Sequence, residues 1–146
     1  MGIKEMRELI GTQPLMVAGS TVVVFNVKRE ILLQQRSDIL KWGFPGGAME
    51  YGESLEETAI RELYEETGLK AKDLKFIDIL SGEKEYYKYP NGDEVFGVTA
   101  IYATSNISGV LSINDNESLN IKFFPLDDLP SNLVEKAHYI IQKYLI

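Results

Sequence analysis

The chain has no cysteine and a single histidine, His138. A disulfide framework and thiol chemistry are therefore excluded, and zinc, which favours cysteine and histidine ligands, is a poor fit. No apolar stretch approaches the ~18 residues needed to cross a membrane, and the first ten residues lack the apolar core of a signal peptide. We therefore expect a cytoplasmic protein with no membrane partner, in which His138 is structural or lies on the surface.

Basic residues are also scarce. Lys and Arg number 15 against 22 Asp and Glu, which gives a net charge of −7. This balance argues against broad binding to a nucleic-acid backbone, so no DNA partner is expected. With 146 residues, of which 45% are hydrophobic, the chain is long enough to bury one core. The sequence shows no repeat or linker, and we interpret residues 1–146 as a single domain.

The acidic residues are concentrated in one stretch. Seven of the 22 lie between residues 50 and 66, where Arg61 is the only base. Ser54, followed by Glu57 three residues later, forms a capping box, and Gly68 suits the left-handed position that ends a helix. The sequence therefore predicts a helix over residues 55–67. Its expected buried arc consists of Leu55, Ala59, Ile60, Leu63 and Tyr64.

Three glutamates of this helix, Glu62, Glu65 and Glu66, fall on an adjoining arc. Their spacing brings like charges within about 5–6 Å, which is mildly destabilising unless something neutralises them. A divalent cation would turn that repulsion into ligation, and an all-oxygen site suits Mg²⁺ or Mn²⁺. The alternative is a solvated acidic helix paired with lysines. It is disfavoured because the helix contains no lysine.

The same stretch resembles a known family. The spacing of Gly47, Glu53, Arg61-Glu62, Glu65-Glu66 and Gly68 looks like the signature of the Nudix hydrolases with no position missing. The resemblance implies an α/β/α sandwich, in which a mixed β-sheet lies between helices. It also implies hydrolysis of a pyrophosphate bond in a nucleoside diphosphate linked to another group. The expected substrate is a nucleoside triphosphate, a dinucleoside polyphosphate, ADP-ribose or a sugar nucleotide.

The resemblance further assigns metal ligands. Glu62, Glu65 and Glu66 would bind Mg²⁺, and the backbone carbonyl of Gly46 or Gly47 would help at the loop. Mn²⁺ is the expected substitute. The cofactor prediction from the resemblance therefore agrees with the one from charge repulsion.

Arg61 and the general base are assigned separately. Arg61 has Glu57 four residues before it and Glu53 further upstream, so we expect it to pin the loop onto the helix, as the resemblance also implies. The base varies within the family. It is sometimes a glutamate of the signature and sometimes an acid in a loop before the last strand. That loop here contains Asp115 and Glu117, and Glu117 is our candidate. The alternative is that Glu117 is a solvated loop acid.

The remaining chain alternates strand and helix patterns. Asn91-Gly92 predicts a hairpin turn, and the glycines between Trp42 and Gly47 predict a loop that approaches a ligand closely. Ser131 is the expected N-cap of the closing helix. The expected strands are residues 15–27, 31–35, 74–80, 83–89, 94–104 and 119–125, and the expected flanking helices are residues 4–10 and 131–144.

Three residues outside the signature are candidates for substrate contact. Arg36, at a strand end, would bind a phosphate; the alternative is an exposed arginine. Phe44 would line the site of the nucleotide base; the alternative is an aromatic side chain of the core. Tyr87 lies 18 positions after Leu69, where a tyrosine in some Nudix subfamilies is associated with diadenosine polyphosphate hydrolysis. Aromatic residues also pack in strands without contacting a ligand.

Other functions on this fold stay open. The first is a non-catalytic nucleotide-binding or sensor module, although such proteins usually degrade the signature. The second, isopentenyl diphosphate isomerisation, uses a cysteine in the family and the chain has none. The third, a recognition domain of an adenine glycosylase, would come attached to a catalytic domain. Oligomeric state is also open: dimers are frequent among similar proteins, so the chain could form a homodimer.

Overall fold

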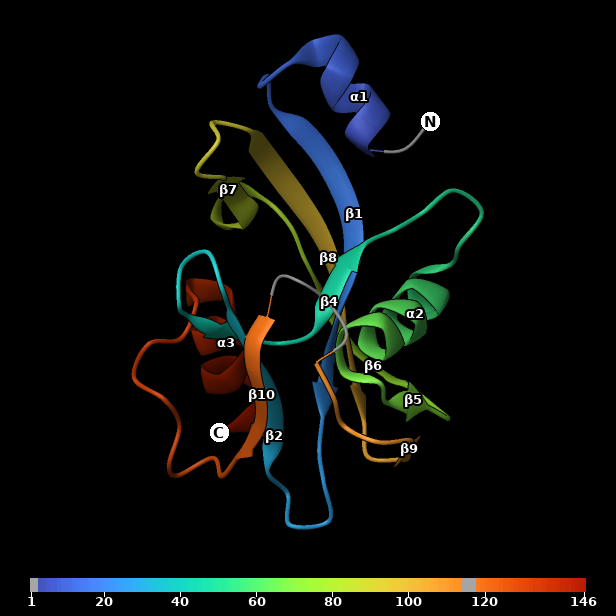
Figure 1. Ribbon diagram of the computed structural model, residues 1–146, viewed down its shortest axis with the longest axis vertical. Helices are drawn as coiled ribbons and strands as arrows, with labels where there is room; N and C mark the ends of the chain where they lie inside the picture. Colours follow the sequence, from blue (N-terminus) through green and yellow to red (C-terminus); the bar gives the residue numbers. More distant parts are fainter. Residues whose placement is uncertain (1–2, 114–117) are drawn as a thin grey trace.

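The computed structural model describes residues 3–113 and 118–146 (Figure 1). The largest sheet has five strands. Its order is β4 (Gly46–Ala48), β1 (Leu15–Val24), β8 (Glu94–Thr104) and β6 (Lys75–Leu80), with β7 (Tyr86–Lys88) also paired to β8. A second sheet contains β10 (Ser118–Phe124), β2 (Ile31–Arg36) and β3 (Trp42–Gly43), and a third contains β5 (Lys70–Ala71) and β9 (Ile107–Ser108).

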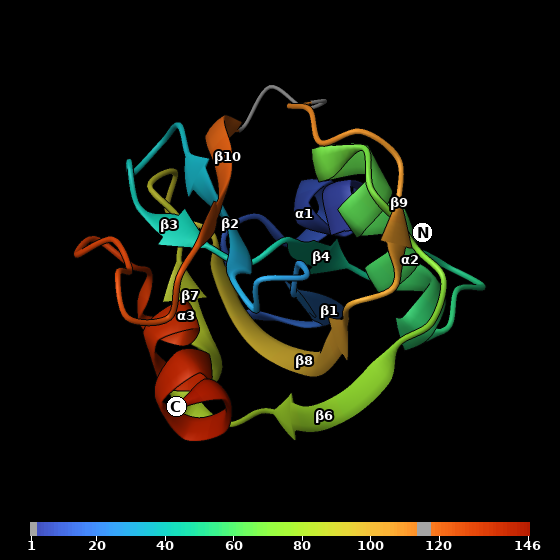
Figure 2. The ribbon, with the colours of Figure 1, turned by 90° about the horizontal axis from the view of Figure 1, so that it is seen from below.

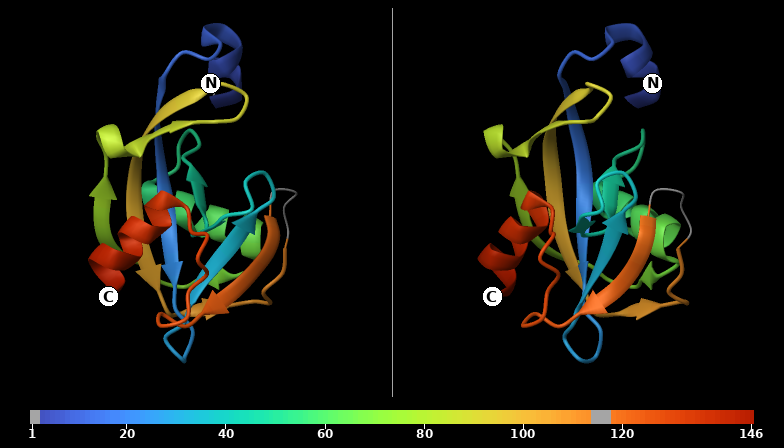
Figure 3. Two further views of the ribbon diagram at one scale, coloured as in Figure 1. Left: turned by 90° about the vertical axis from the view of Figure 1, so that its left-hand side faces the viewer. Right: turned by 60° about the vertical axis from the view of Figure 1, so that its left-hand side comes forward.

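The long strands β1 and β8 form the centre of the molecule. They run parallel over ten registered pairs, from Leu15 opposite Val95 to Val24 opposite Thr104. β4 and β6 pair with them in the antiparallel direction, so the sheet is mixed, as the sequence predicts. An antiparallel bridge between Phe25 and Ile31 connects this sheet to β2. Figure 3 shows β2 and β10 side by side, diverging from β1 and β8.

Apolar side chains pack on both sides of β1. Val22 and Val24 belong to the cluster that contains Leu63 of α2 (Leu55–Thr67), whereas Val23 belongs to the cluster that contains Ile140 of α3 (Glu135–Ile140). This division follows from the alternation of side chains along a strand. Figure 2 shows β1 and β8 between the two helices. The expected α/β/α sandwich is therefore confirmed.

Elements with strong local signals agree with the sequence. α2 spans the predicted residues, and α1 (Ile3–Ile10) is followed by Gly11 with φ 66°. Gly92 has φ 94° in the turn between β7 and β8, where the Tyr89 N–H donates to the Asp93 carbonyl. The hairpin is therefore confirmed. The apolar arc of α2 is narrower than expected, because Ile60 and Tyr64 are exposed while Thr58 and Thr67 are buried.

The closing helix differs from its prediction. It begins at Glu135, after Val134 as N-cap, and continues into a π-helical turn over Ile141–Leu145. Ser131 is not the N-cap. The Trp42 N–H donates to the Asn132 carbonyl, and the Val134 N–H donates to the Trp42 carbonyl. These residues are extended beside β3 and cannot join the helix.

Several short elements were not anticipated. The segment predicted as one strand over residues 83–89 is a 3₁₀ turn, η1 (Glu83–Glu85), followed by the three residues of β7. The predicted loop over residues 42–47 contains β3 and part of β4. Strands of two or three residues are defined by their pairing with other strands, and they are too short to show a repeating pattern of their own. Over the part of the chain that the structure describes, no helix combines the length and apolar character needed to span a membrane.

Candidate active site

α2 is fixed at both ends by local contacts. The Ser54 hydroxyl accepts a hydrogen bond from the Glu57 N–H at 3.1 Å, and the Ser54 N–H donates to the Glu57 carboxylate at 2.9 Å. Gly68 ends the helix with φ 78°, and its N–H donates to the Tyr64 carbonyl. The predicted capping box and left-handed glycine are thus both present, and they set where the acidic residues lie.

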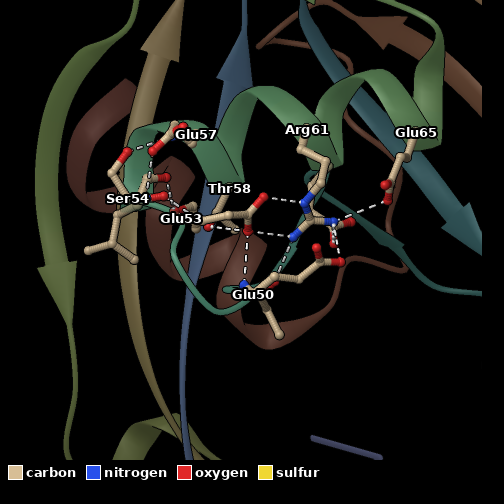
Figure 4. Close-up of polar contacts among 11 residues, drawn as sticks. Glu50, Glu53, Ser54, Glu57, Thr58, Arg61 and Glu65 are labelled. Carbon is tan, nitrogen blue, oxygen red and sulfur yellow. Dashed lines mark hydrogen bonds and ion pairs between the residues drawn. The ribbon is translucent and has the colours of Figure 1, made fainter. Parts of the chain in front are cut away.

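Arg61 joins α2 to the loop before it (Figure 4). Its Nε and Nη2 atoms donate to the two carboxylate oxygens of Glu53, at 2.5 and 2.9 Å, in the bidentate arrangement that suits a guanidinium. Nη2 also donates to the Ala48 carbonyl in β4 at 2.9 Å. Glu53 accepts two further hydrogen bonds, from the Thr58 hydroxyl and the Glu50 N–H. The contacts agree with the expected pinning role of Arg61.

These contacts keep Glu53 ionised. Hydrogen bonds from Arg61 lower the pKa of Glu53 from its ordinary 4.5 to about 2. The same hydrogen bonds raise the pKa of Arg61. Both groups therefore carry full charge at neutral pH, and the loop is tied to the helix by an ion pair as well as by hydrogen bonds.

Glu62 and Glu65 also face Arg61. The Nη1 atom of Arg61 donates to Glu62 Oε1 at 2.9 Å and to Glu65 Oε2 at 3.2 Å. The Glu62 carboxylate lies against Gly47, where a Cβ atom would come within 2.4–2.7 Å of the carboxylate atoms. Burial raises the pKa of Glu62, and Arg61 opposes that rise. A side chain at Gly47 would therefore displace Glu62 from the loop.

Glu66 points to a different part of the fold. Its Oε1 atom accepts a hydrogen bond from Gln34 Nε2 of β2 at 3.1 Å, and its Oε2 atom accepts one from the Gly46 N–H at 2.9 Å. Gly46 is packed closely against β1, since a Cβ atom there would lie 2.3 Å from the Ser20 carbonyl oxygen. Glu66 therefore connects α2 to two strands.

The three carboxylates contact different hydrogen-bond donors in the structure. Within residues 3–113 and 118–146, no group of three or more His, Cys, Asp and Glu side chains is arranged to hold a metal ion. The reason is the choice of hydrogen-bond donors. Glu62 and Glu65 turn toward the guanidinium of Arg61, whereas Glu66 turns toward the amide of Gln34.

A small cavity is lined by Gln34, the hydrogen-bond partner of Glu66, and by two of the predicted substrate residues. Arg36 and Phe44 both line it, and its volume is about 170 Å³. The third predicted residue, Tyr87, is adjacent, because the Arg36 guanidinium carbon lies 5.9 Å from the centre of its ring. Arg36 is also paired with Asp38 at 2.6 Å. The other lining residues are Thr21, Gln34, Gly43, Val134, Lys136, Ala137 and Ile140.

A family model described as NUDIX domain matches residues 16–144. The chain belongs to the NUDIX domain family. It is 32% identical over 124 residues to a Mus musculus protein named nucleoside diphosphate-linked moiety X motif 6, with 81% of this chain and 36% of that protein covered. It is 37% identical over 68 residues to an RNA pyrophosphohydrolase of Histophilus somni (strain 2336), with 47% of this chain and 34% of that protein covered. The chain thus spans about a third of the length of the curated relatives it matches.

Solved structures share the Nudix fold. A MutT NUDIX hydrolase from Burkholderia pseudomallei superimposes with a TM-score of 0.76 at 22% identity, covering 89% of this chain and 98% of that one. The NUDIX domain of Shewanella oneidensis NrtR, solved in complex with ADP ribose, gives 0.71 at 24% identity and covers 97% and 96%. At these identities the likeness shows the fold alone.

The donor set of the Nudix helix fits a divalent cation chemically. The glutamate side chains and the Gly46 and Gly47 carbonyls supply oxygen alone, which is the preference of Mg²⁺. An ionised carboxylate has about four acceptor positions, so one hydrogen bond to each oxygen leaves room for ligation. The Glu62 carboxylate lies against Gly47, one of the two loop residues that the prediction assigns to the metal site.

One predicted residue stays untested, and the structure adds two residues that the sequence analysis did not name. The candidate base Glu117 lies outside the described residues, so its role stays a prediction. Gln34 and Lys136, which line the cavity, were not anticipated. Gln34 carried a signal, because it is the first polar residue after the apolar run Ile31 to Leu33, at a position that the strand buries. Lys136 carried none, since its neighbours Thr99 and Glu85 are distant in sequence.

Proposed function

We propose that this Nudix domain hydrolyses a pyrophosphate bond in a nucleoside diphosphate linked to another group, with Mg²⁺ as cofactor and Mn²⁺ as substitute. The observation that carries the proposal is the position of Gln34. It contacts Glu66 of the Nudix helix and lines the cavity that contains Arg36 and Lys136. One proposed metal ligand, Glu66, is therefore connected through Gln34 to a cavity with two cations suited to phosphate oxygens, which supports the proposal.

Each residue has a distinct part in this proposal. Glu62, Glu65 and Glu66, with the Gly46 or Gly47 carbonyl, would hold the metal ion, which when bound neutralises phosphate charge and activates water. Arg61 positions Glu53 and Glu62 without touching substrate. Glu117 is the proposed general base, outside the described residues.

Substrate contacts are assigned to the cavity and its rim. Arg36 would donate to a phosphate oxygen after exchanging its exposed pairing with Asp38. Phe44 and Tyr87 would contact the nucleotide base of the substrate through the faces of their rings. The names of two relatives, RNA pyrophosphohydrolase and NAD-capped RNA hydrolase, support pyrophosphate chemistry on a nucleotide. The partner is therefore a nucleotide-derived molecule, with no DNA, and a homodimer is compatible with the proposal.

Nucleotide binding without turnover is the second candidate. The observation that favours it is the engagement of Glu62 and Glu65 by Arg61, which competes with metal ligation. The NUDIX domain of NrtR, which was solved with ADP ribose, provides a structural parallel. In this case nucleotides would bind but would not be hydrolysed.

A hydrolysis screen tests the proposal. Wild-type protein is incubated with Mg²⁺ or Mn²⁺ and each of the nucleoside triphosphates, dinucleoside polyphosphates, ADP-ribose and sugar nucleotides, and phosphate release is measured with a coupled phosphatase or pyrophosphatase. Glu66→Gln is expected to lower turnover by about 100-fold or more, since charge stabilisation and water activation both depend on the metal. Glu56→Gln is the matched control, because Glu56 is an exposed glutamate of the same helix.

The outcomes separate the two candidates. Turnover in wild type and Glu56→Gln, with loss in Glu66→Gln, supports the enzyme. Nucleotide binding by calorimetry without turnover in any protein favours the binding module. A Glu66→Gln variant that keeps the wild-type rate at saturating Mg²⁺ contradicts the assignment of Glu66 as a ligand.

A further inference from the structure

Gln34 has a buried acceptor that the fold leaves unpaired. The residue is 8% exposed, and its Oε1 atom has no hydrogen-bond partner among the residues that the structure describes. Buried polar atoms are almost always paired, because an unpaired acceptor has lost its water without compensation. On a residue that lines a cavity, such an atom is a candidate acceptor for a bound molecule.

The orientation of this amide is set by its neighbour. Gln34 Nε2 donates to Glu66 Oε1 at 3.1 Å. Exchanging the amide oxygen and nitrogen would place an acceptor against a carboxylate, so the observed orientation is the one with a favourable contact. Because Nε2 is committed to Glu66, Oε1 is the polar atom of this side chain that is left for a further donor.

The cavity is otherwise poor in acceptors. Arg36 and Lys136 are cationic donors, and Phe44, Val134 and Ile140 are apolar; Thr21, Gly43 and Ala137 complete the lining beside Gln34. Lys136 is already engaged, since its Nζ atom donates to the Thr99 hydroxyl at 2.7 Å and pairs with Glu85 at 3.1 Å. The volume of about 170 Å³ is below the ~300 Å³ of typical ligand pockets, so it admits part of a ligand rather than a whole nucleotide.

We propose that Gln34 is a specificity-determining residue of this Nudix domain, which accepts a hydrogen bond from an N–H or O–H group of the nucleoside. The inference rests on the proposed function, and it adds which kind of group on the nucleoside the cavity recognises, namely a hydrogen-bond donor. A nucleoside that presents a donor pairs Oε1, whereas one that presents an acceptor or a C–H group leaves it unpaired. The same side chain orients Glu66, so nucleoside recognition and the Nudix helix are linked through one amide.

Matched nucleotides measure this selection. Nucleoside monophosphates are titrated into the protein by calorimetry, with and without Mg²⁺, so the readout is affinity and does not require turnover. The pairs differ by one donor each: guanosine and inosine for the 2-amino group, adenosine and purine riboside for the 6-amino group, inosine and 1-methylinosine for N1–H, and ribose and 2′-deoxyribose for the hydroxyl. One pair is expected to differ by about 5- to 150-fold in wild type, the range for loss of one hydrogen bond with an acceptor left unpaired.

Gln34→Met tests the assignment. Methionine keeps the length and most of the volume but removes both polar atoms, so the difference within that pair is expected to fall below about 2-fold. Gln35→Met is the matched control, since Gln35 is the next residue of β2, on the opposite face, and its side chain bonds the Leu40 carbonyl. It is expected to keep the wild-type difference. Thermal unfolding of both variants checks that each is folded.

Several results would overturn the inference. If Gln34→Met retains the donor selection, Gln34 does not read the nucleoside. If it weakens all nucleotides equally and only when Mg²⁺ is present, its role is confined to orienting Glu66. If no pair differs in wild type while the hydrolysis screen succeeds, this inference fails and the proposed function stands. If wild type neither binds nor hydrolyses any nucleotide, both fail.

Should Gln34→Met not fold, Gln34→Glu provides the second measurement. Its side chain keeps an acceptor toward the cavity but places a second carboxylate oxygen against Glu66. Mn²⁺ binding is measured by electron paramagnetic resonance without nucleotide. Retained donor selection together with weaker Mn²⁺ binding supports the inference. Loss of donor selection with unchanged Mn²⁺ binding contradicts it.

Discussion

Arg61 shows how one side chain decides where several others lie. It contacts Glu53 through two hydrogen bonds, the Ala48 carbonyl through one, and two glutamates of its own helix. A lysine could not reproduce this pattern, because its single ammonium lacks the planar fork of a guanidinium. The sequence allowed the Arg61 to Glu53 contact to be predicted, since both residues belong to the signature. It did not allow the contact between Gln34 and Glu66, which depends on how β2 packs beside α2.

Acid should lower the free energy of unfolding of the protein through protonation of Glu53. Its folded-state pKa of about 2 lies below its ordinary value of 4.5, so the ionised pair with Arg61 contributes stability at neutral pH. A lowered carboxylate pKa means that this contribution is complete above pH 4.5 and is lost as the pH falls toward 2. We expect the difference in free energy of unfolding between wild type and Glu53→Gln to be constant above about pH 5 and to shrink below it.

Urea unfolding at a series of pH values measures this difference. Glu56→Gln, which changes an exposed charge on the same helix, corrects for the general effect of acid on the protein. A wild-type advantage over Glu53→Gln that stays constant down to pH 2.5 would show that Glu53 is not the group that titrates.

At the scale of the element, α2 is the part whose bounds the sequence specifies best. Ser54, Glu57 and Gly68 act on backbone groups within a few residues, so their effect can be read without knowing the rest of the fold. The start of α3 could not be read in this way. Backbone pairing of Asn132 and Val134 with Trp42 overrides the capping tendency of Ser131. β3 and β4 were missed for the same reason, since their pairing with β2 and β1 defines them.

The capping box should make a measurable contribution to the free energy of unfolding. Ser54→Ala removes the acceptor for the Glu57 N–H and is expected to lower the free energy of unfolding by about 1 kcal/mol. Ser37→Ala is the matched control, because Ser37 lies in an exposed turn. Chemical denaturation compares the two variants with wild type. Equal unfolding midpoints for all three proteins would mean that the capping box contributes nothing measurable.

For the whole molecule, the division into two apolar clusters sets how mutations combine. Leu63 and Ile140 are both fully buried, yet they belong to clusters separated by β1. Leu63→Ala should lower the free energy of unfolding by about 2–5 kcal/mol, and Ile140→Val by about 0.5–1.5 kcal/mol. Residues without shared contacts usually contribute additively, so the double variant should lose the sum within about 0.5 kcal/mol.

Additivity and cooperativity are separate consequences of this arrangement, and one set of urea titrations tests both. Because β1 contributes Val22 and Val24 to one cluster and Val23 to the other, neither cluster can unfold without disturbing the central strand. Tryptophan fluorescence reports Trp42, which packs in the α3 cluster, whereas far-ultraviolet circular dichroism reports all helices and strands. The two signals should follow one transition in each single variant. Separate transitions in Leu63→Ala would mean that α2 unfolds independently, and the Nudix helix would then owe its position to Arg61 and the caps more than to the core.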